Sequence, residues 1–263
     1  YMDRRSPEYV PEILALALRR SPEEIASITL PTILGPWDAA GYGAEEHGWG
    51  DIVLGPGCGD NAGAALGIGL EPGQALLSLG TSGVVAVVSP EPVADPSGLV
   101  TGFADATGNW LPLACTLNAS RIIDAVAAII GADYREYDEL ALSVPDAGGL
   151  VLLPYFEGER TPNLPEATAS LTGMTLANAD RAHVARAGVE GLLSLMRGAL
   201  DAVRGLGVTI STVYLVGGGA KSTAVQALAG HLLEATVELP AAAEYVALGA
   251  ARQAHHVSSA VTK

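Results

Sequence analysis

The sequence predicts an α/β fold, in which helices pack closely against a β-sheet. Aromatic residues make up only 5% of the chain, while Ala, Gly, Leu and Val dominate, and small residues allow helices to approach a sheet closely. The last third of the chain alternates strand and helix patterns, which is typical of an α/β layer. Three glycine-rich turns also lie at junctions where strands are expected to end.

The first seventy residues predict mostly helices and loops. A Glu71-Pro72-Gly73 breaker follows them and marks a candidate boundary between two domains. Before it we expect a helix over 9–20, a short helix from Ser21, a surface loop over 35–50, a strand over 51–54 and a helix over 60–70.

After this boundary the patterns predict a strand-rich segment as far as Cys115, followed by longer helices. The helix over 180–204 is the longest, with Asp180 as its N-cap. We further expect a helix over 118–130, a buried strand over 150–153, a polar loop over 157–166, a strand over 212–216, a helix over 222–234, a strand over 235–239 and a helix over 246–256.

Composition excludes some classes of partner. The formal net charge is −15, and no Lys/Arg stripe occurs, which argues against nucleic acid and against an anionic membrane surface. No apolar run approaches the roughly 18 residues that a membrane span needs. Cys58 and Cys115 lie in no metal-ligand spacing, and we expect two small buried thiols in a reducing compartment. We therefore expect a cytoplasmic protein.

The most informative turn is Gly80-Thr81-Ser82-Gly83, between two apolar segments that both read as strands. Its glycines allow a sharp turn and the close approach of another group. Thr81 and Ser82 add hydroxyls beside exposed backbone N–H groups, and such groups form anion-binding nests. The turn is therefore either an ordinary hairpin or a site for the end of a polyphosphate.

A second glycine-rich turn, residues 55–59, leads into Asp60-Asn61 at the start of a predicted helix. Asp60 either caps this helix or serves as a general base that accepts a hydroxyl proton during attack on phosphorus. Asn61 either orients a substrate or completes the cap.

The third turn, Gly217-Gly218-Gly219, follows a strand and opens a helix near Ser222. Three glycines leave bare backbone against which a flat ligand can lie. The spacing matches neither a Walker A loop nor a dinucleotide fingerprint. In the loop after residue 153, Glu157 and Glu159 are both candidates for an ion pair with Arg160.

Five motifs in this order resemble the FGGY family of carbohydrate kinases, over nearly the whole chain. Within that family, the Gly-Glu-Arg-Thr-Pro loop is most similar to the xylulokinase branch. The motifs are Gly-Asp-Asn-Ala at 59–62, Ser-Leu-Gly-Thr-Ser-Gly at 78–83, Gly-Glu-Arg-Thr-Pro at 158–162, Gly-Gly-Gly-Ala-Lys-Ser at 217–222 and Tyr-Val-Ala-Leu-Gly-Ala-Ala at 245–251.

This resemblance implies an actin-like, ribonuclease H-like ATPase fold and phosphoryl transfer from ATP, with Mg²⁺, to a sugar hydroxyl. D-xylulose is the implied sugar, and xylulose 5-phosphate is the implied product. Asp60 aligns with the family's catalytic base, and Asp60 and Asn61 are the expected sugar contacts. No residue of this chain is expected to ligate the metal directly. The nucleotide contacts implied by the resemblance are Gly80, Thr81 and Ser82 for phosphate, and Gly218, Gly219 and Ser222 for adenosine.

The family's first-domain Asp-x-Gly-Thr phosphate loop is absent, and the chain starts Tyr1-Met2-Asp3, which is not a natural initiator sequence. We therefore expect a fragment in which residues 1–72 are the tail of the first domain and 73–263 are a complete second domain. Such a fragment lacks the first-domain groups that contact the substrates from the other side, and little or no kinase activity is expected from it alone.

Two other functions remain open at this stage. One is a related kinase for gluconate, ribulose or glycerol. The other is a non-catalytic nucleotide-binding module of the actin/Hsp70 type, against which Asp60 beside Asn61 argues, because only a kinase needs a hydroxyl base there. A homodimer is also left open.

Overall fold

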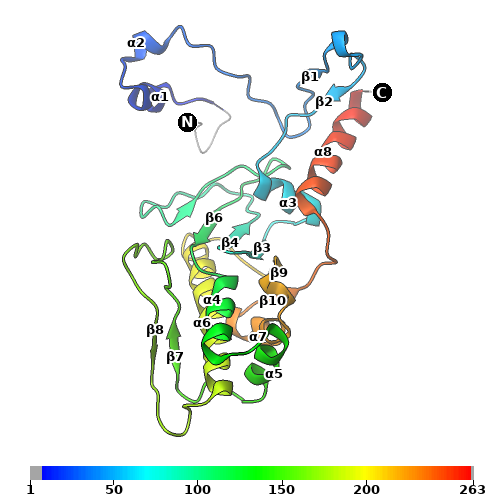
Figure 1. The fold of residues 1–263 in the computed structure, drawn as a ribbon. Coiled ribbons are helices and arrows are strands. Elements are labelled where there is room, and N and C mark those ends of the chain that lie inside the picture. The colour runs from blue at the N-terminus through cyan, green and yellow to red at the C-terminus, as the bar shows by residue number, and fades with distance from the viewer. Residues whose placement is uncertain (1–7, 262–263) are drawn as a thin grey trace.

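A six-stranded mixed β-sheet forms the centre of the computed structural model, which describes residues 8–261 (Figure 1). The residues Tyr1-Met2-Asp3, on which the expectation of a fragment partly rests, lie outside the described range. The strand order β10-β9-β3-β4-β6-β5 confirms the predicted α/β class.

The strands are β1 (Gly41–Tyr42), β2 (Val53–Leu54), β3 (Gln74–Leu79), β4 (Gly83–Val87), β5 (Val100–Thr101), β6 (Leu113–Thr116), β7 (Val151–Leu153), β8 (Ser170–Thr172), β9 (Thr212–Val216) and β10 (Thr236–Glu238). The α-helices are α1 (Pro11–Leu18), α2 (Pro22–Ile25), α3 (Asp60–Ile68), α4 (Ser120–Ile130), α5 (Tyr134–Leu142), α6 (Arg181–Arg204), α7 (Thr223–Leu233) and α8 (Tyr245–Val261), with 3₁₀ turns η1 (Glu45–His47) and η2 (Gly219–Lys221).

The pairing of the central strands brings several loops to one end of the sheet. Strand β3 is parallel to β9, with Ser78 opposite Val216, so the chain leaves both strands at the same end. Strand β3 turns directly into antiparallel β4, whose first residue, Gly83, lies opposite Thr116 at the end of β6. The exits of β9 and β6 therefore flank the β3–β4 turn.

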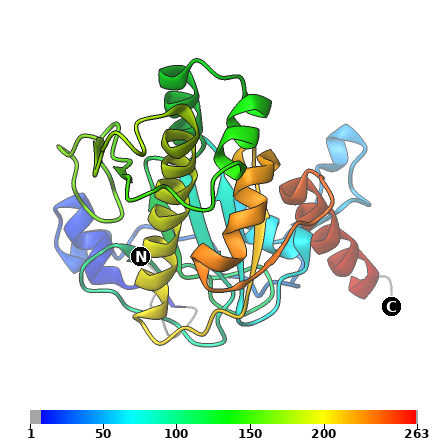
Figure 2. The ribbon, with the colours of Figure 1, turned by 90° about the horizontal axis from the view of Figure 1, so that it is seen from below.

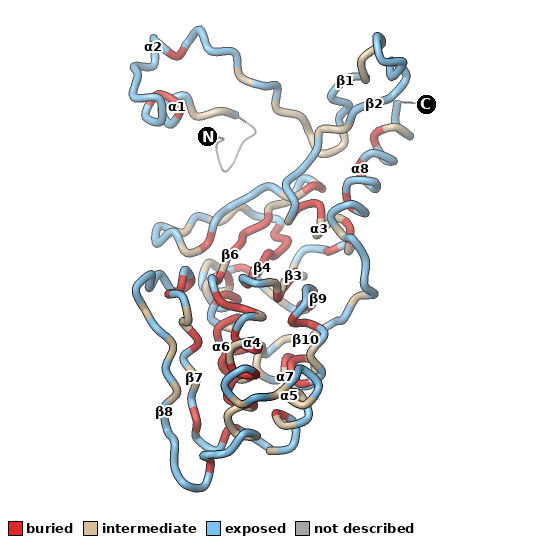
Figure 3. Tube along the Cα trace, viewed as in Figure 1, coloured by how far each residue is buried: buried red, intermediate tan, exposed pale blue. Residues whose placement is uncertain are grey.

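One face of the sheet is covered by α4, α6 and α7, with α5 packed against α6 and α7 (Figure 2). The main core lies here and includes Leu77 and Leu79 of the sheet beside Leu192 and Met196 of α6, and Figure 3 shows burial concentrated in these layers. Asp180 caps α6, as predicted, through hydrogen bonds from two backbone N–H groups of its first turn. Although α6 is 24 residues long, no helix in the described part is both long and apolar enough to cross a membrane.

The other face is covered by α3, which packs against α8. Ala62 and Ala65 of α3 join a second core cluster with Leu76 and Ala86 of the sheet. The first residue of α3, Asp60, lies within electrostatic range of Cys115, which pairs with Val84 near the β3–β4 turn. Helix α3 precedes the predicted boundary at 71–73 yet packs on the sheet that follows it, and the division into two domains stays a prediction.

Two sequence-based expectations were wrong. The segment predicted as a buried strand, β7, pairs only with β8 outside the central sheet, and Val151 and Leu153 are 61% and 42% exposed. Its continuous apolar run resembled a buried strand, but only Leu152 packs against the main core, while Leu150, just before β7, is buried in a small separate cluster with Ala147 and Ala187. Helix α5 was not predicted, although Asp133 caps it and Tyr137 buries its ring completely.

The contact between α3 and α8 is made backbone to backbone at glycines. A methyl group on Gly249 would overlap the carbonyl group of Gly63, whereas a methyl group on Gly198 of α6 would meet open space. We expect Gly249→Ala to lower the free energy of unfolding by about 1–3 kcal/mol, because the helices must separate. The matched change Gly198→Ala should raise it by about 0.5–1 kcal/mol. Chemical denaturation measures both, and equal values for the two variants would contradict this packing.

Candidate active site

The turn Gly80–Ser82 connects β3 to β4, and the first residue of α4 holds its backbone in place by a hydrogen bond. The carbonyl oxygen of Gly80 accepts a hydrogen bond from Ser120 N at 2.9 Å. Next to it, Gly83 N donates to Thr116 Oγ1 at 3.1 Å. Thr81 and Ser82 are exposed, and their hydroxyls have no hydrogen-bond partner among the described residues, so they are available to a ligand.

The three glycines that follow β9 lie in different surroundings. Gly217 has φ +94°, and a Cβ there would lie 2.7 Å from the backbone of Leu79, while a Cβ on Gly219 would lie 2.9 Å from Leu79 Cβ. These two glycines let the turn lie directly on the end of β3. A Cβ on Gly218 would meet nothing within 4 Å, so the backbone there faces open space.

Beside these turns lies a cavity of about 740 Å³ between α4, α5 and the segment 218–223. Its size is in the range typical of small-molecule sites. Its lining includes Ser120, Tyr134, Asp138, Gly218, Gly219, Lys221 and Ser222. The wall of the cavity therefore includes all three residues that the sequence analysis assigned to adenosine, Gly218, Gly219 and Ser222.

Asp138 joins two segments of the cavity wall, α5 and the start of α7, by hydrogen bonds. Its carboxylate accepts hydrogen bonds from Ser222 Oγ at 2.6 Å and from Thr223 N at 2.7 Å and Oγ1 at 3.1 Å. Ser222 Oγ in turn accepts from Val225 N and caps α7. Since Asp138 lies on the helix that the sequence did not predict, its role could not be foreseen.

Asp60 is the first helical residue of α3, and Gly59 is the N-cap. One carboxylate oxygen, Oδ1, accepts hydrogen bonds from Asn61 N at 2.7 Å and Nδ2 at 3.1 Å. The other oxygen has no partner among residues 8–261, and the side chain is exposed. Asp60 thus accepts hydrogen bonds in the first turn of α3 and still has a free oxygen that could accept one from a hydroxyl group. Its geometry is compatible with both interpretations from the sequence, a helix cap and a general base.

Cys58 is exposed and Cys115 of β6 is only partly buried, so the expectation of two buried thiols is wrong. Cys115 lies within electrostatic range of Asp60 and Arg160. Burial raises the pKa of its thiol, the positive charge of Arg160 lowers it and the negative charge of Asp60 raises it. The thiol is therefore protonated at neutral pH. Asp60 and Arg160, which are 100 residues apart in sequence, lie near the same side chain.

Neither glutamate of the loop after β7 pairs with Arg160. Glu157 pairs with Arg121 instead. Glu159 is 1% exposed and uses its carboxylate as an acceptor for Leu117 N at 2.6 Å, Asn118 Nδ2 at 2.9 Å and Arg160 N at 2.7 Å. The expected surface ion pair is wrong for Glu159, because five N–H donors at the end of β6 and in its own loop surround the carboxylate.

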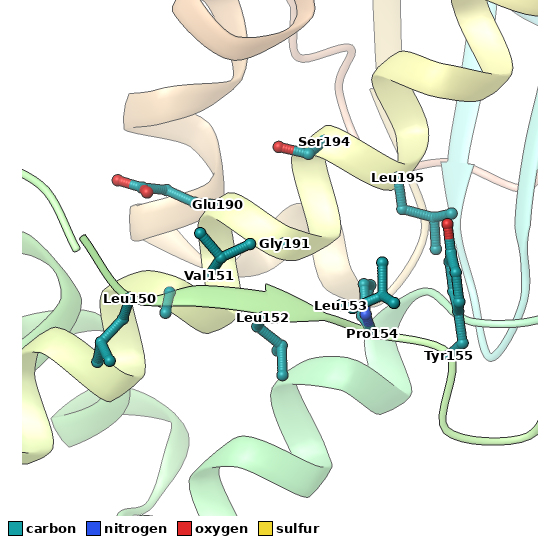
Figure 4. Close-up of a pocket in the computed structure, with 11 residues that line it drawn as sticks. Leu150, Val151, Leu152, Leu153, Pro154, Tyr155, Glu190, Gly191, Ser194 and Leu195 are labelled. Atoms are coloured by element: carbon teal, nitrogen blue, oxygen red, sulfur yellow. The ribbon is translucent and has the colours of Figure 1, made fainter. Parts of the chain in front are cut away.

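A second cavity, of about 310 Å³, lies between β7 and α6, away from these turns (Figure 4). Its wall is mostly apolar, and the carboxylate of Glu190 forms an ion pair with Arg186. It contains none of the residues that the sequence singled out.

In the described range, no group of three or more His, Cys, Asp or Glu side chains could hold a metal ion. Mg²⁺ commonly keeps several waters and binds through one or two carboxylates together with substrate phosphates. A metal ion held mainly by substrate phosphates and waters needs no such cluster of side chains.

The mixed sheet with helices on both faces has the actin-like, ribonuclease H-like ATPase fold, as its similarity to solved structures of carbohydrate kinases shows. A model of the FGGY family of carbohydrate kinases, C-terminal domain, matches residues 75–257, and the chain belongs to this family.

The relatives include xylulose kinases. The chain is 44% identical over 230 residues to xylulose kinase of Streptomyces coelicolor, covering 86% of this chain and 46% of the relative. It is 32% identical over 224 residues to that of Haemophilus influenzae, covering 84% and 45%. The crystal structure of xylulose kinase from Bifidobacterium adolescentis superposes with a TM-score of 0.91 at 49% identity, covering 100% of this chain and 54% of that one. The chain thus spans about half the length of the curated relatives it matches.

The stabilising effect of the hydrogen bonds from Ser222 and Thr223 to Asp138 can be tested by comparing Asp138 with a neighbouring carboxylate, Asp124. We expect Asp138→Asn to lower the free energy of unfolding by about 1–3 kcal/mol, because an amide cannot satisfy all three donors of Ser222 and Thr223. Asp124 lines the same cavity, is exposed and accepts one hydrogen bond, from Tyr134 Oη. Asp124→Asn should change stability by less than about 0.5 kcal/mol. Thermal melts of both variants measure the difference in stability. A melting temperature of Asp138→Asn equal to that of the wild type would contradict a stabilising role for these hydrogen bonds.

Proposed function

We propose that the chain is the nucleotide-binding part of an ATP-dependent sugar kinase that converts D-xylulose to xylulose 5-phosphate. The observation that carries the proposal is the meeting of Asp60, the turn Gly80–Ser82 and the glycines after β9 at one end of the sheet. The similarity to xylulose kinases favours this sugar over the others.

In this proposal Asp60 accepts the proton of the sugar hydroxyl as that oxygen attacks the γ-phosphorus of ATP. Asn61 hydrogen-bonds Asp60 and contacts the sugar. Gly80, Thr81 and Ser82 bind phosphate oxygens through backbone N–H groups and free hydroxyls. Gly218, Gly219 and Ser222 form the wall against which the adenosine lies.

Mg²⁺ would neutralise charge on the ATP phosphates. Its ligands would be phosphate oxygens and waters, and no described residue is assigned as a direct ligand, because Asp60 is the base in this proposal.

Two alternatives are weighed against this proposal. Kinases for gluconate, ribulose or glycerol share the family, and glycerol kinases are among the relatives, at 29–30% identity. A non-catalytic module of the actin/Hsp70 type would have no use for the unpartnered oxygen of Asp60. The assignment of residues 1–72 to a first domain, a homodimer and a cytoplasmic location belong to the same proposal.

The substrate and the base can be tested together in the full-length protein. Among xylulose, ribulose, gluconate and glycerol, we expect xylulose to give the highest kcat/KM in an ADP-release assay. Asp60→Asn should lower kcat by about 10²–10⁴-fold, because the amide cannot take the proton. Its affinity for ADP, measured by calorimetry, should not change. Full activity of Asp60→Asn would show that another group is the base.

Residues 1–263 alone should bind ADP but transfer little or no phosphate, because positioning for phosphoryl transfer requires groups from both sides of the substrates. The same assay on the isolated chain tests this. Turnover of about 1–100 s⁻¹, as typical kinases show, would mean that this half is sufficient.

A further inference from the structure

The loop after β7 is tied by buried hydrogen bonds to the last residues of β6. Thr161 Oγ1 donates to the carbonyl oxygen of Cys115 at 2.8 Å. The carboxylate of Glu159, which is almost fully buried, accepts from Leu117 N and from the side chain of Asn118. Arg160 lies between these two anchors, and its own N–H donates to Glu159 Oε1 at 2.7 Å. The backbone position of Arg160 is therefore fixed although its side chain is exposed.

This anchoring places Arg160 at the phosphate end of the sheet. Cys115 pairs with Val84 and Thr116 with Gly83, the first residues of β4 after the turn Gly80–Ser82. The loop thus docks on the strand beside that turn. Asp60 and Arg160 both act electrostatically on the Cys115 thiol, so each lies within electrostatic range of that residue.

The guanidinium of Arg160 has no ion-pair or hydrogen-bond partner among the described residues. The chain has 29 acidic and 14 basic residues, and of the nine other described arginines Arg19, Arg20 and Arg252 likewise form no ion pair. Six other described arginines each form an ion pair with a carboxylate: Arg121, Arg135, Arg181, Arg186, Arg197 and Arg204. A fixed, unpaired arginine at this place is suited to an anion that arrives with the substrate.

We infer that Arg160 binds the phosphoryl group in transit, and that Glu159 is the positioning residue that holds it there. The inference rests on the proposed kinase function. In the reaction the bond between the γ-phosphorus and the β,γ-bridging oxygen breaks, and a bond from the sugar oxygen to the same phosphorus forms. The hydroxyl proton goes to Asp60 and the electron pair leaves with ADP. Arg160 stabilises the negative charge on the non-bridging oxygens throughout, as its planar fork of N–H donors fits them.

The test is Arg160→Ala in the full-length protein, with Arg121→Ala as the matched control, since Arg121 binds the same loop but is paired with Glu157. We expect kcat to fall by about 10²–10³-fold in Arg160→Ala, with KM for the sugar and the affinity for ADP nearly unchanged. Millimolar guanidinium should restore part of the rate, which a merely structural role would not allow. Arg121→Ala should stay within about threefold of wild type.

Three results would overturn the assignment of Arg160. They are a kcat within threefold of wild type, a loss that guanidinium does not restore, and a raised KM for the sugar with unchanged kcat, which would make Arg160 a sugar contact. A wild-type protein without activity on any sugar overturns the proposed function and this inference with it. An active wild type beside an equally active Arg160→Ala overturns this inference alone.

Glu159 is tested by its coupling to Arg160. Glu159→Gln should lower kcat about tenfold or more, because an amide cannot accept all five N–H groups. If Glu159 acts through Arg160, the double variant Glu159→Gln/Arg160→Ala loses no more activity than Arg160→Ala alone. Losses that multiply in the double variant would show that Glu159 acts independently of Arg160.

Discussion

The site depends on the parallel pairing of β9 with β3, closed by the glycines that follow β9. Gly217 and Gly219 bring the turn onto the backbone of Leu79, where any side chain would force the two segments apart. That contact sets the distance between the turn Gly80–Ser82 and the wall of the large cavity. Because both segments rest on the same buried strand, their spacing is as rigid as the core beneath them.

The sequence predicted the elements whose signal is local. Apolar periodicity and an aspartate cap located α6, and strand–turn–helix alternation located β9, α7 and β10. The strand β7 was misjudged, because a short apolar run has the same pattern whether it is buried or exposed. The roles of Asp138 and Glu159 depend on partners between 41 and 85 residues away in sequence, and no local pattern encodes such contacts.

Two carboxylates of an acidic chain serve as internal anchors instead of surface charges. Asp138 binds the start of α7 through one backbone N–H and two hydroxyl groups, and Glu159 binds the segment that follows β6 and its own loop, mostly through backbone N–H groups. Hydrogen bonds from several N–H donors compensate for removing a carboxylate from water. The carboxylate of Glu159 is used for these donors, and the guanidinium of Arg160 forms no ion pair among the described residues.

The glycine contact between α3 and α8 has a mechanical consequence. The two helices touch along their backbones, and Arg252 of α8 also donates to the carbonyl oxygen of Leu66 in α3. Because no bulky side chain separates the two backbones at these glycines, a shift of one helix along the other would meet direct steric overlap. Asp60 is the first residue of α3, so a movement of that helix as a unit would have to carry α8 along.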